Sequence, residues 1–284
     1  DGTYEAIKRR IISFVSDGAS VMQGKWKGMA TLLRKEFGNQ LVSVHCGNHR
    51  LELAFGHSMD QFESFKRLEQ QANKLYSFYS IANKKRYGKL MEFLEENNLE
   101  EFNIHYVFKV RWVDSHRAVI KKIYDHQAEI VGHLKEMIRN EGNKVSPMAN
   151  LAKKAKKRPT TATKATSLLK FYTNKNVILT TTYQLDVQAT FSKISQIFQR
   201  NDESIIGFAR AKTDIIENLH KLRDPRNGPE TAKFLDTAIC DGAPCGTMDN
   251  FEQSNNVVWK GIALESVFVK GMCGYDDFEK LSEI

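Results

Sequence analysis

Apolar residues that recur every three or four positions dominate the chain after residue 49. This spacing is the period of an α-helix with one buried face, so it predicts several amphipathic helices around a common core. The stripes run through residues 62–79, 113–138, 183–198 and 205–219. After a Pro- and Gly-containing break at residues 224–229, only weak helical signals remain. We therefore expect a mainly α-helical fold.

A different pattern precedes these helices. Residues 10–16 and 41–45 are rich in β-branched and aromatic residues, as in short strands, and residues 21–37 have the apolar spacing of one helix. Two strands joined by a helical crossover pair in parallel, with a right-handed connection. The sequence thus predicts a small α/β part, a βαβ unit, in front of the helical part.

The composition is that of an ordinary globular protein. The 284 residues are 41% hydrophobic and 27% charged. No apolar run approaches the ~18 residues of a membrane span, and the first ten residues do not resemble a signal peptide. These two features indicate no membrane association. The four cysteines are few and irregularly spaced, so we expect no disulfide framework and a reducing compartment. The chain is interpreted as part of a longer protein.

The net charge of +8 is concentrated in one stretch. Residues 144–175 carry nine Lys and Arg and no Asp or Glu, and five of the nine are Lys153, Lys154, Lys156, Lys157 and Arg158. A basic run of this kind, followed by Pro159, fits a solvated linker, a nuclear-import signal or a phosphate-binding segment. We assign residues 144–166 to a basic linker.

The predicted βαβ unit brings polar residues to one edge of the sheet. Because both strands point the same way, Asp17 should lie beside Cys46 and His49. Asp17 suits a hard cation such as Mg²⁺, although one carboxylate alone binds it poorly, and Asp17 or Ser20 could instead cap the next helix. The Cys-x₂-His unit suggests zinc, but no second pair of ligands is convincing, so structural zinc is not expected.

Arg111 and Trp112 open the amphipathic segment that runs to residue 138. A Trp at the start of a helix is often a packed anchor. Beside an Arg, it could instead stack on an unpaired base while the guanidinium group binds phosphate. Both interpretations stay open from the sequence alone.

Three motifs in this order resemble the core of hAT-family transposases and of their domesticated relatives. They are Ser-Asp-Gly-Ala-Ser-Val-Met-x-Gly-Lys at 16–25, Val-Ser-Val-His-Cys-x-x-His-Arg-Leu-x-Leu-Ala at 42–54, and Arg-Trp at 111–112. Each motif alone is weak, and the ordered combination is specific. The resemblance covers residues 1–225.

The resemblance implies an incomplete ribonuclease-H-like βαβ unit followed by a large all-helical insertion domain. Residues 1–46 would be a fragment of the ribonuclease-H-like domain, and residues 47–143 the first part of the insertion domain. The second part would be residues 167–284, poorly defined after residue 225. Such enzymes cut DNA with three acidic residues and two divalent metal ions.

The resemblance also implies roles for individual residues. Asp17 matches the second acidic residue, which is catalytic and a metal ligand. The residues expected to contact nucleic acid are Lys25, Cys46, His49, Arg111 and Trp112. The first and third acidic residues have no recognisable counterpart in this chain. Mg²⁺ or Mn²⁺ is therefore expected in the intact ancestral enzyme and not as a tightly bound ion here.

The function expected from these features is that of a transposase-derived nuclear DNA-binding protein whose ancestral cleavage and strand-transfer activity is lost in this chain. Double-stranded DNA or transposon ends would be the partners, with possible homo-oligomers through regions outside this chain. The alternative is an interaction scaffold or a SUMO-ligase-like protein derived from a transposase.

Overall fold

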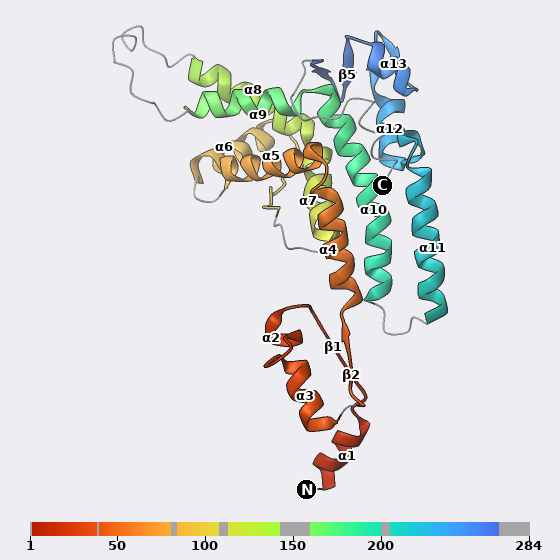
Figure 1. The fold of residues 1–284 in the computed structure, drawn as a ribbon. Coiled ribbons are helices and arrows are strands. Elements are labelled where there is room, and N and C mark those ends of the chain that lie inside the picture. Colours follow the sequence, from red (N-terminus) through yellow and green to blue (C-terminus); the bar gives the residue numbers. More distant parts are fainter. Residues whose placement is uncertain are drawn as a thin grey trace.

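The protein is described here by a computed structural model, which covers residues 2–38, 40–80, 84–107, 113–142, 160–199 and 205–266 (Figure 1). The described part is mainly helical, with two small sheets. Arg111, Trp112 and the basic residues 144–159 lie outside the described residues, as does everything after residue 266. No helix in the described ranges is long and apolar enough to cross a membrane.

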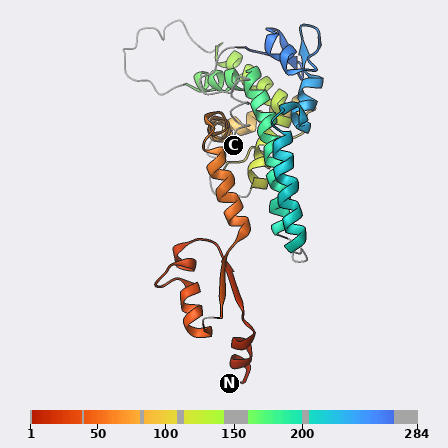
Figure 2. The same cartoon turned by 45° about the vertical axis from the view of Figure 1, so that its right-hand side comes forward.

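The N-terminal part contains the expected parallel pair of strands. Its elements are α1 (Gly2–Arg10), β1 (Ser13–Ser16), α2 (Ser20–Gln23), α3 (Met29–Phe37) and β2 (Val42–His45). The register pairs Ser13 with Val42 and Ser16 with His45. We call residues 2–46 the βαβ unit. In Figures 1 and 2 it projects from the helical body at the start of the helix that follows β2.

The prediction of one helix over residues 21–37 is wrong, because α2 and α3 are separated by a loop. Gly24 and Gly28 make this loop possible. A Cβ atom on Gly24 would lie 2.3 Å from the Ser20 carbonyl oxygen, and one on Gly28 would lie 2.3 Å from the Gly24 nitrogen. The chain therefore turns sharply at a place where the apolar spacing alone suggests a continuous helix.

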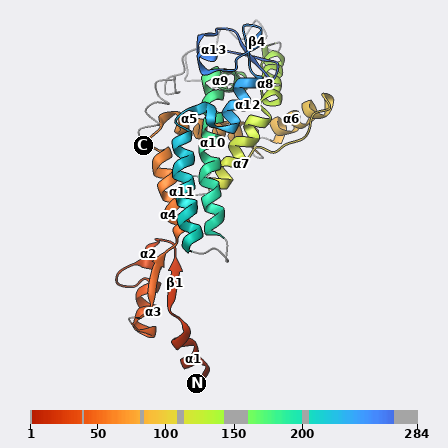
Figure 3. The ribbon, with the colours of Figure 1, turned by 90° about the vertical axis from the view of Figure 1, so that its right-hand side faces the viewer.

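The helical body begins with α4 and confirms the four predicted stripes. Its first eight helices are α4 (Gly47–Met59), α5 (Glu63–Tyr79), α6 (Lys84–Glu96), α7 (Val113–Asp125), α8 (Gln127–Gly142), α9 (Thr161–Tyr172), α10 (Lys175–Phe198) and α11 (Ile205–Lys221). The long helix α10 packs against α4, α5, α7 and α11, and the views in Figures 1 and 3 agree on its central place. Leu75, Ile130 and Leu185 in the core are fully buried.

Two predicted boundaries differ from the structure. The stripe over residues 113–138 belongs to two helices, α7 and α8, which are separated at His126. The segment 160–166, assigned to the basic linker, contains the start of α9. Thr160 caps this helix, since its hydroxyl oxygen accepts a hydrogen bond from the Thr163 N–H (3.1 Å).

The C-terminal region is not all-helical, which corrects the prediction for residues 167–284. After a 3₁₀ turn (Pro225–Asn227) and α12 (Pro229–Thr237), four strands form an antiparallel sheet in the order β4-β3-β5-β6. The strands are β3 (Ile239–Cys240), β4 (Ala243–Pro244), β5 (Val257–Trp259) and β6 (Ile262–Leu264), with α13 (Met248–Gln253) between β4 and β5. Strands of two or three residues are too short to show an alternating pattern, so the sequence pattern missed them.

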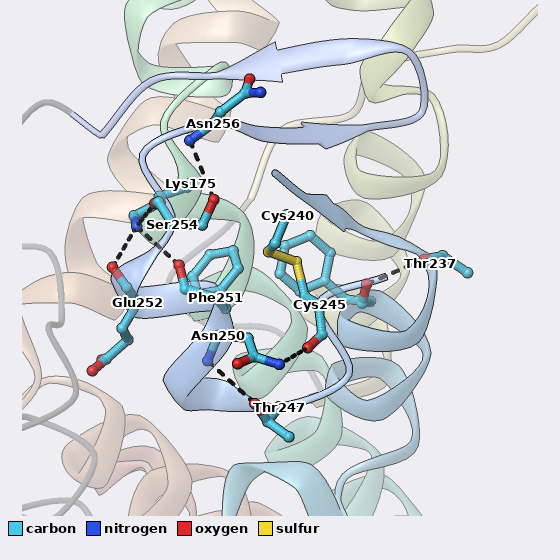
Figure 4. Close-up of a disulfide and its surroundings, with 11 residues drawn as sticks. Lys175, Thr237, Cys240, Cys245, Thr247, Asn250, Phe251, Glu252, Ser254 and Asn256 are labelled. Atoms are coloured by element: carbon cyan, nitrogen blue, oxygen red, sulfur yellow. Dashed lines mark hydrogen bonds between the residues drawn. A yellow bond between two sulfur atoms is a disulfide. The ribbon is translucent and has the colours of Figure 1, made fainter. Parts of the chain in front are cut away.

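A disulfide joins Cys240 to Cys245 across the first hairpin of this sheet (Figure 4). The irregular cysteine spacing did not predict this bond. In the same figure, the Lys175 ammonium group donates to the carbonyl oxygens of Phe251, Glu252 and Ser254, at 3.0, 3.0 and 2.8 Å. Lys175 thus satisfies the C-terminal carbonyls of α13 and fixes this helix on the start of α10.

Candidate functional site

The carboxyl ends of β1 and β2 form the site that the sequence predicted. Ser16 and His45 are register partners, and the Cys46 N–H donates to the Ser16 carbonyl oxygen (2.7 Å). Parallel pairing therefore continues to the last residue of both strands. Asp17 and Cys46 leave the sheet side by side, as expected for parallel strands.

Gln23 of α2 ties the two strands together at this edge. Its Nε2 group donates to the Ser16 hydroxyl oxygen (2.7 Å), and its Oε1 atom accepts from the Ser43 hydroxyl (3.0 Å). Ser16 and Ser43 lie on the same face of the sheet, which α2 covers. The amide side chain fixes the position of α2, and with it the position of the loop that follows α2.

Asp17 is exposed, and its Oδ1 atom accepts a hydrogen bond from the Ala19 N–H (3.1 Å). This bond forms a local turn before α2 and not the helix cap that the capping interpretation predicted for Asp17 or Ser20. Ser20 makes no such bond, and the residue at the helix N-cap, Ala19, has no side chain that can cap. Asp17 thus shapes the turn between β1 and α2.

His45 lies under this turn and next to His49. A Cβ atom on Gly18 would lie 2.7 Å from Cε1 of His45, so only glycine fits over the ring. The His45 and His49 ring centroids are 5.5 Å apart. The His45 Nε2 atom is buried and has no hydrogen-bond partner among the described residues. In the sequence, His45 entered only as a neighbour of the Cys-x₂-His unit in the zinc interpretation, and it belongs to the second motif.

The site continues into α4, which connects it to the helical body. Cys46 is the residue before α4, a half-buried free thiol, and His49 lies in the first turn. Asn48 is buried and accepts a hydrogen bond from the Ser195 hydroxyl of α10 (3.0 Å). This contact fixes the orientation of the first turn of α4 and therefore of His49.

Glu52, one turn after His49, caps helix α7. Both of its carboxylate oxygens accept from the Val113 N–H, at 2.9 and 3.0 Å. Burial raises the pKa of Glu52, while this hydrogen bond and nearby His116 and His49 oppose the rise. The sequence analysis did not single out Glu52. Arg111 and Trp112, which precede Val113, lie outside the described residues, so the choice between anchor and base stacking stays a prediction.

A basic and aromatic loop, Lys25-Trp26-Lys27, follows α2. All three residues are exposed, and Trp26 has 77% of its surface accessible. The loop is held by Gly28, whose N–H donates to the Gly24 carbonyl oxygen (3.0 Å). The Thr31 hydroxyl lies within hydrogen-bond distance of the carbonyl oxygens of Gly24 and Lys25, at 3.0 and 3.2 Å. The Lys25 ammonium group lies 5.2 Å from the centre of the Trp26 ring.

The side chains described at this edge do not assemble a metal centre. In the described ranges, no three His, Cys, Asp or Glu side chains are close enough together to hold a metal ion. A pair of Mg²⁺ ions needs several carboxylates, so the geometry of Asp17, Cys46 and His49 does not fit a two-metal site.

Within the described part of the chain, no element covers the face of the sheet opposite α2. Val15 and Val44 are register partners on this face and are 59% and 46% exposed, and Val42 is 57% exposed. Parallel strands are normally covered on both faces. No described residue before Phe55 belongs to the main hydrophobic core. The βαβ unit therefore presents both an apolar face and a polar edge.

Comparison of the chain with protein-family models, with curated proteins and with solved structures gives no match. The resemblance to hAT-family transposases therefore rests on the three sequence motifs. The parallel βαβ unit is compatible with that resemblance and is also a common unit of other folds.

Proposed function

We propose that the chain is part of a transposase-derived nuclear protein and that it binds DNA at the carboxyl edge of the βαβ unit. The observation that carries this proposal is the Lys25-Trp26-Lys27 loop, which directly follows α2 and holds an exposed indole ring between two exposed lysines in the sequence. A large aromatic ring that is 77% exposed and flanked by cations suits stacking on a base while the lysines contact phosphates.

The surrounding charge supports the same ligand. Residues 1–50 contain eight Lys and Arg against four Asp and Glu. Phosphate contacts by such side chains release counterions and supply most of the affinity for nucleic acid. We assign the ring of Trp26 to an unpaired base and Lys25 and Lys27 to its phosphates. His49 and Cys46 would border the same strand of DNA, as the resemblance implies.

The loop is tested by fluorescence anisotropy with a labelled duplex that ends in a single-stranded overhang. Trp26→Ala should weaken binding by about 1 to 3 kcal/mol, the usual range for one base stacked on one aromatic ring. Trp26→Phe should keep part of the affinity. Lys25→Gln together with Lys27→Gln should lower the slope of log K against log salt by about 1.4, for two phosphate contacts on a single strand.

Lys35→Gln is the matched control, since Lys35 is exposed on α3 of the same unit but belongs to neither the loop nor the sheet edge. Losing one lysine there should leave the affinity nearly unchanged. Equal affinity of the Trp26→Ala variant and the original chain would contradict the assignment of the loop. A loss of the same size in the Lys35→Gln variant would also contradict it, because any lysine of the βαβ unit would then contribute equally through its charge.

The second candidate is an interaction scaffold, which the uncovered face of the sheet favours. Val15, Val42 and Val44 form an apolar strip of the kind that packs against another protein surface. This candidate predicts self-association in sedimentation velocity that Val44→Lys abolishes, with DNA affinity unchanged. A monomer at all concentrations would remove this candidate and leave the DNA-binding proposal untouched.

A further inference from the structure

A cavity of about 630 Å³ lies between α5, α6 and α9, far along the chain from the proposed DNA-binding edge. Its charged lining residues are all basic: Lys74 of α5, Arg86 of α6 and Lys164 of α9. No Asp or Glu is among the lining residues. The volume is within the range of small-molecule sites, about 300 to 1,000 Å³.

Within the described ranges, the three cations of this cavity have no acidic partner. None of them forms an ion pair with a described residue. A neighbouring cavity of about 550 Å³ shares Arg86 but is also lined by Glu92, Glu96, Glu136 and Glu141, so its four acidic residues outnumber its three basic ones. The contrast identifies the first cavity, and not the second, as a site of uncompensated positive charge. The charge of this lining is complementary to that of an anionic ligand.

Two contacts hold the walls of this cavity in place. The Arg86 guanidinium carbon lies 4.7 Å from the centre of the buried Phe78 ring, which fixes the direction of the guanidinium group. The Asn73 side-chain amide donates to the Val107 carbonyl oxygen (2.9 Å) and accepts from the Val107 N–H (2.7 Å). This pair of hydrogen bonds fixes the backbone next to Tyr106, whose partly exposed ring lines the cavity.

The remaining wall is uncharged and mixes polar side chains with apolar Leu168. Gln70 and Gln71 supply side-chain amides, which can both donate and accept hydrogen bonds. Gln71 is 8% exposed, and its Oε1 atom has no hydrogen-bond partner among the described residues. A ligand made of phosphate alone would use the cations and leave the amides and the aromatic ring unused.

We propose that this cavity binds a nucleotide-sized ligand, with its phosphate between Lys74, Arg86 and Lys164. The base lies against the ring of Tyr106, and its polar edge meets the amides of Gln70 and Gln71. Cations in a fixed position, an aromatic wall and neutral donors and acceptors match the three parts of such a ligand. The site is separate from the DNA-binding edge and does not depend on it.

Isothermal titration calorimetry of the full chain with AMP tests this assignment, with ribose 5-phosphate and inorganic phosphate as parallel arms. AMP should bind saturably at millimolar concentration, and the two arms without a base should bind more weakly. Arg86→Gln and Lys164→Gln should each weaken AMP binding by about tenfold or more, because each removes a charged hydrogen-bond donor. Tyr106→Ala should weaken AMP binding but not phosphate binding.

Lys89→Gln is the matched control, because Lys89 lies one turn from Arg86 on α6 and lines only the neighbouring cavity. This variant should bind AMP as the original chain does. Thermal melting identifies any variant that fails to fold. Because Lys164 is exposed on a helix, the Lys164→Gln variant is expected to fold, so the proposal can be tested even if another variant does not. Absence of AMP binding, equal binding of inorganic phosphate, or unchanged binding in both cavity variants would overturn the proposal.

Discussion

Buried His133 should make the stability of the helical body fall in mild acid. Its side chain is 2% exposed in α8, and its Nδ1 atom lies 2.9 Å from the Tyr79 hydroxyl oxygen. Burial, together with the charge of nearby Lys89, lowers the pKa of His133 to about 4. Burial also raises the pKa of Tyr79, so its hydroxyl keeps its proton and can donate it to the neutral imidazole.

The sign follows from the protons bound in each state. In the unfolded chain His133 titrates with a pKa of about 6.5, so below that pH the unfolded state takes up a proton that the folded state refuses. The stability contributed by neutral His133 is complete above about pH 6.5 and is lost as the pH falls toward about 4. Between about pH 7 and about pH 4.5, the expected loss in the free energy of unfolding is about 2 kcal/mol.

Urea unfolding followed by far-ultraviolet circular dichroism at both pH values measures this loss. His133→Gln keeps a group that can accept from Tyr79 but does not titrate, so the difference between the two pH values should shrink by about 2 kcal/mol. His57→Gln is the control, because His57 is exposed on α4. The same pH dependence in the His133→Gln variant and the original chain would refute the reasoning.

Two further predictions concern the fold and the chemistry. Asp186→Ala should lower the free energy of unfolding, measured by chemical denaturation, by about 2 to 4 kcal/mol. The reason is that the buried Asp186 carboxylate caps the start of α12. It accepts hydrogen bonds from the Glu230 N–H (2.8 Å) and from the Thr231 N–H (3.0 Å) and hydroxyl (2.8 Å). The exposed-site variant Asp60→Ala should cost little, and an equal cost would contradict this role. The second prediction is that the chain with Mn²⁺ leaves nicked DNA intact; cleavage that disappears in Asp17→Ala would show that a metal-binding carboxylate was overlooked.

The helical body was predictable because burial leaves a periodic trace in the sequence. Leu68, Leu75, Ile130 and Leu134 recur at helical spacing and are buried in the core. The break between α2 and α3 was not predictable from this period. It depends on the close backbone approach of Gly24 and Gly28, which becomes visible only when the atoms are placed.

The C-terminal sheet was missed although the sequence holds a signal for it. Asp241 and Gly242 have φ values of 52° and 93°, and Lys260 and Gly261 have 48° and 71°. Two successive residues with positive φ characterise the tight turn of a two-residue hairpin, for which Asp-Gly is a favoured pair. The pair Asp241-Gly242 predicts the first hairpin, whereas strand alternation does not.

At the candidate edge, the position of Asp17 beside Cys46 was predictable from the sequence, but the exposed Trp26 was not. Parallel pairing placed Asp17 beside Cys46 from topology alone, as the register shows. The exposure of Trp26 was beyond the sequence, because an aromatic residue near an apolar stripe is usually buried and the pattern of residues 21–37 suggested a helix. The motif resemblance directed attention to Trp112 instead.

Cross-linking tests the central claim most directly. A bromodeoxyuridine-containing overhang duplex is irradiated in complex with the full chain, and mass spectrometry identifies the protein residues joined to DNA. Stacking of a base on the exposed indole ring predicts cross-links at Trp26, lost in the Trp26→Ala variant and retained in Lys35→Gln. Cross-links confined to segments outside residues 2–46, with none in the Lys25-Trp26-Lys27 loop, would contradict the account.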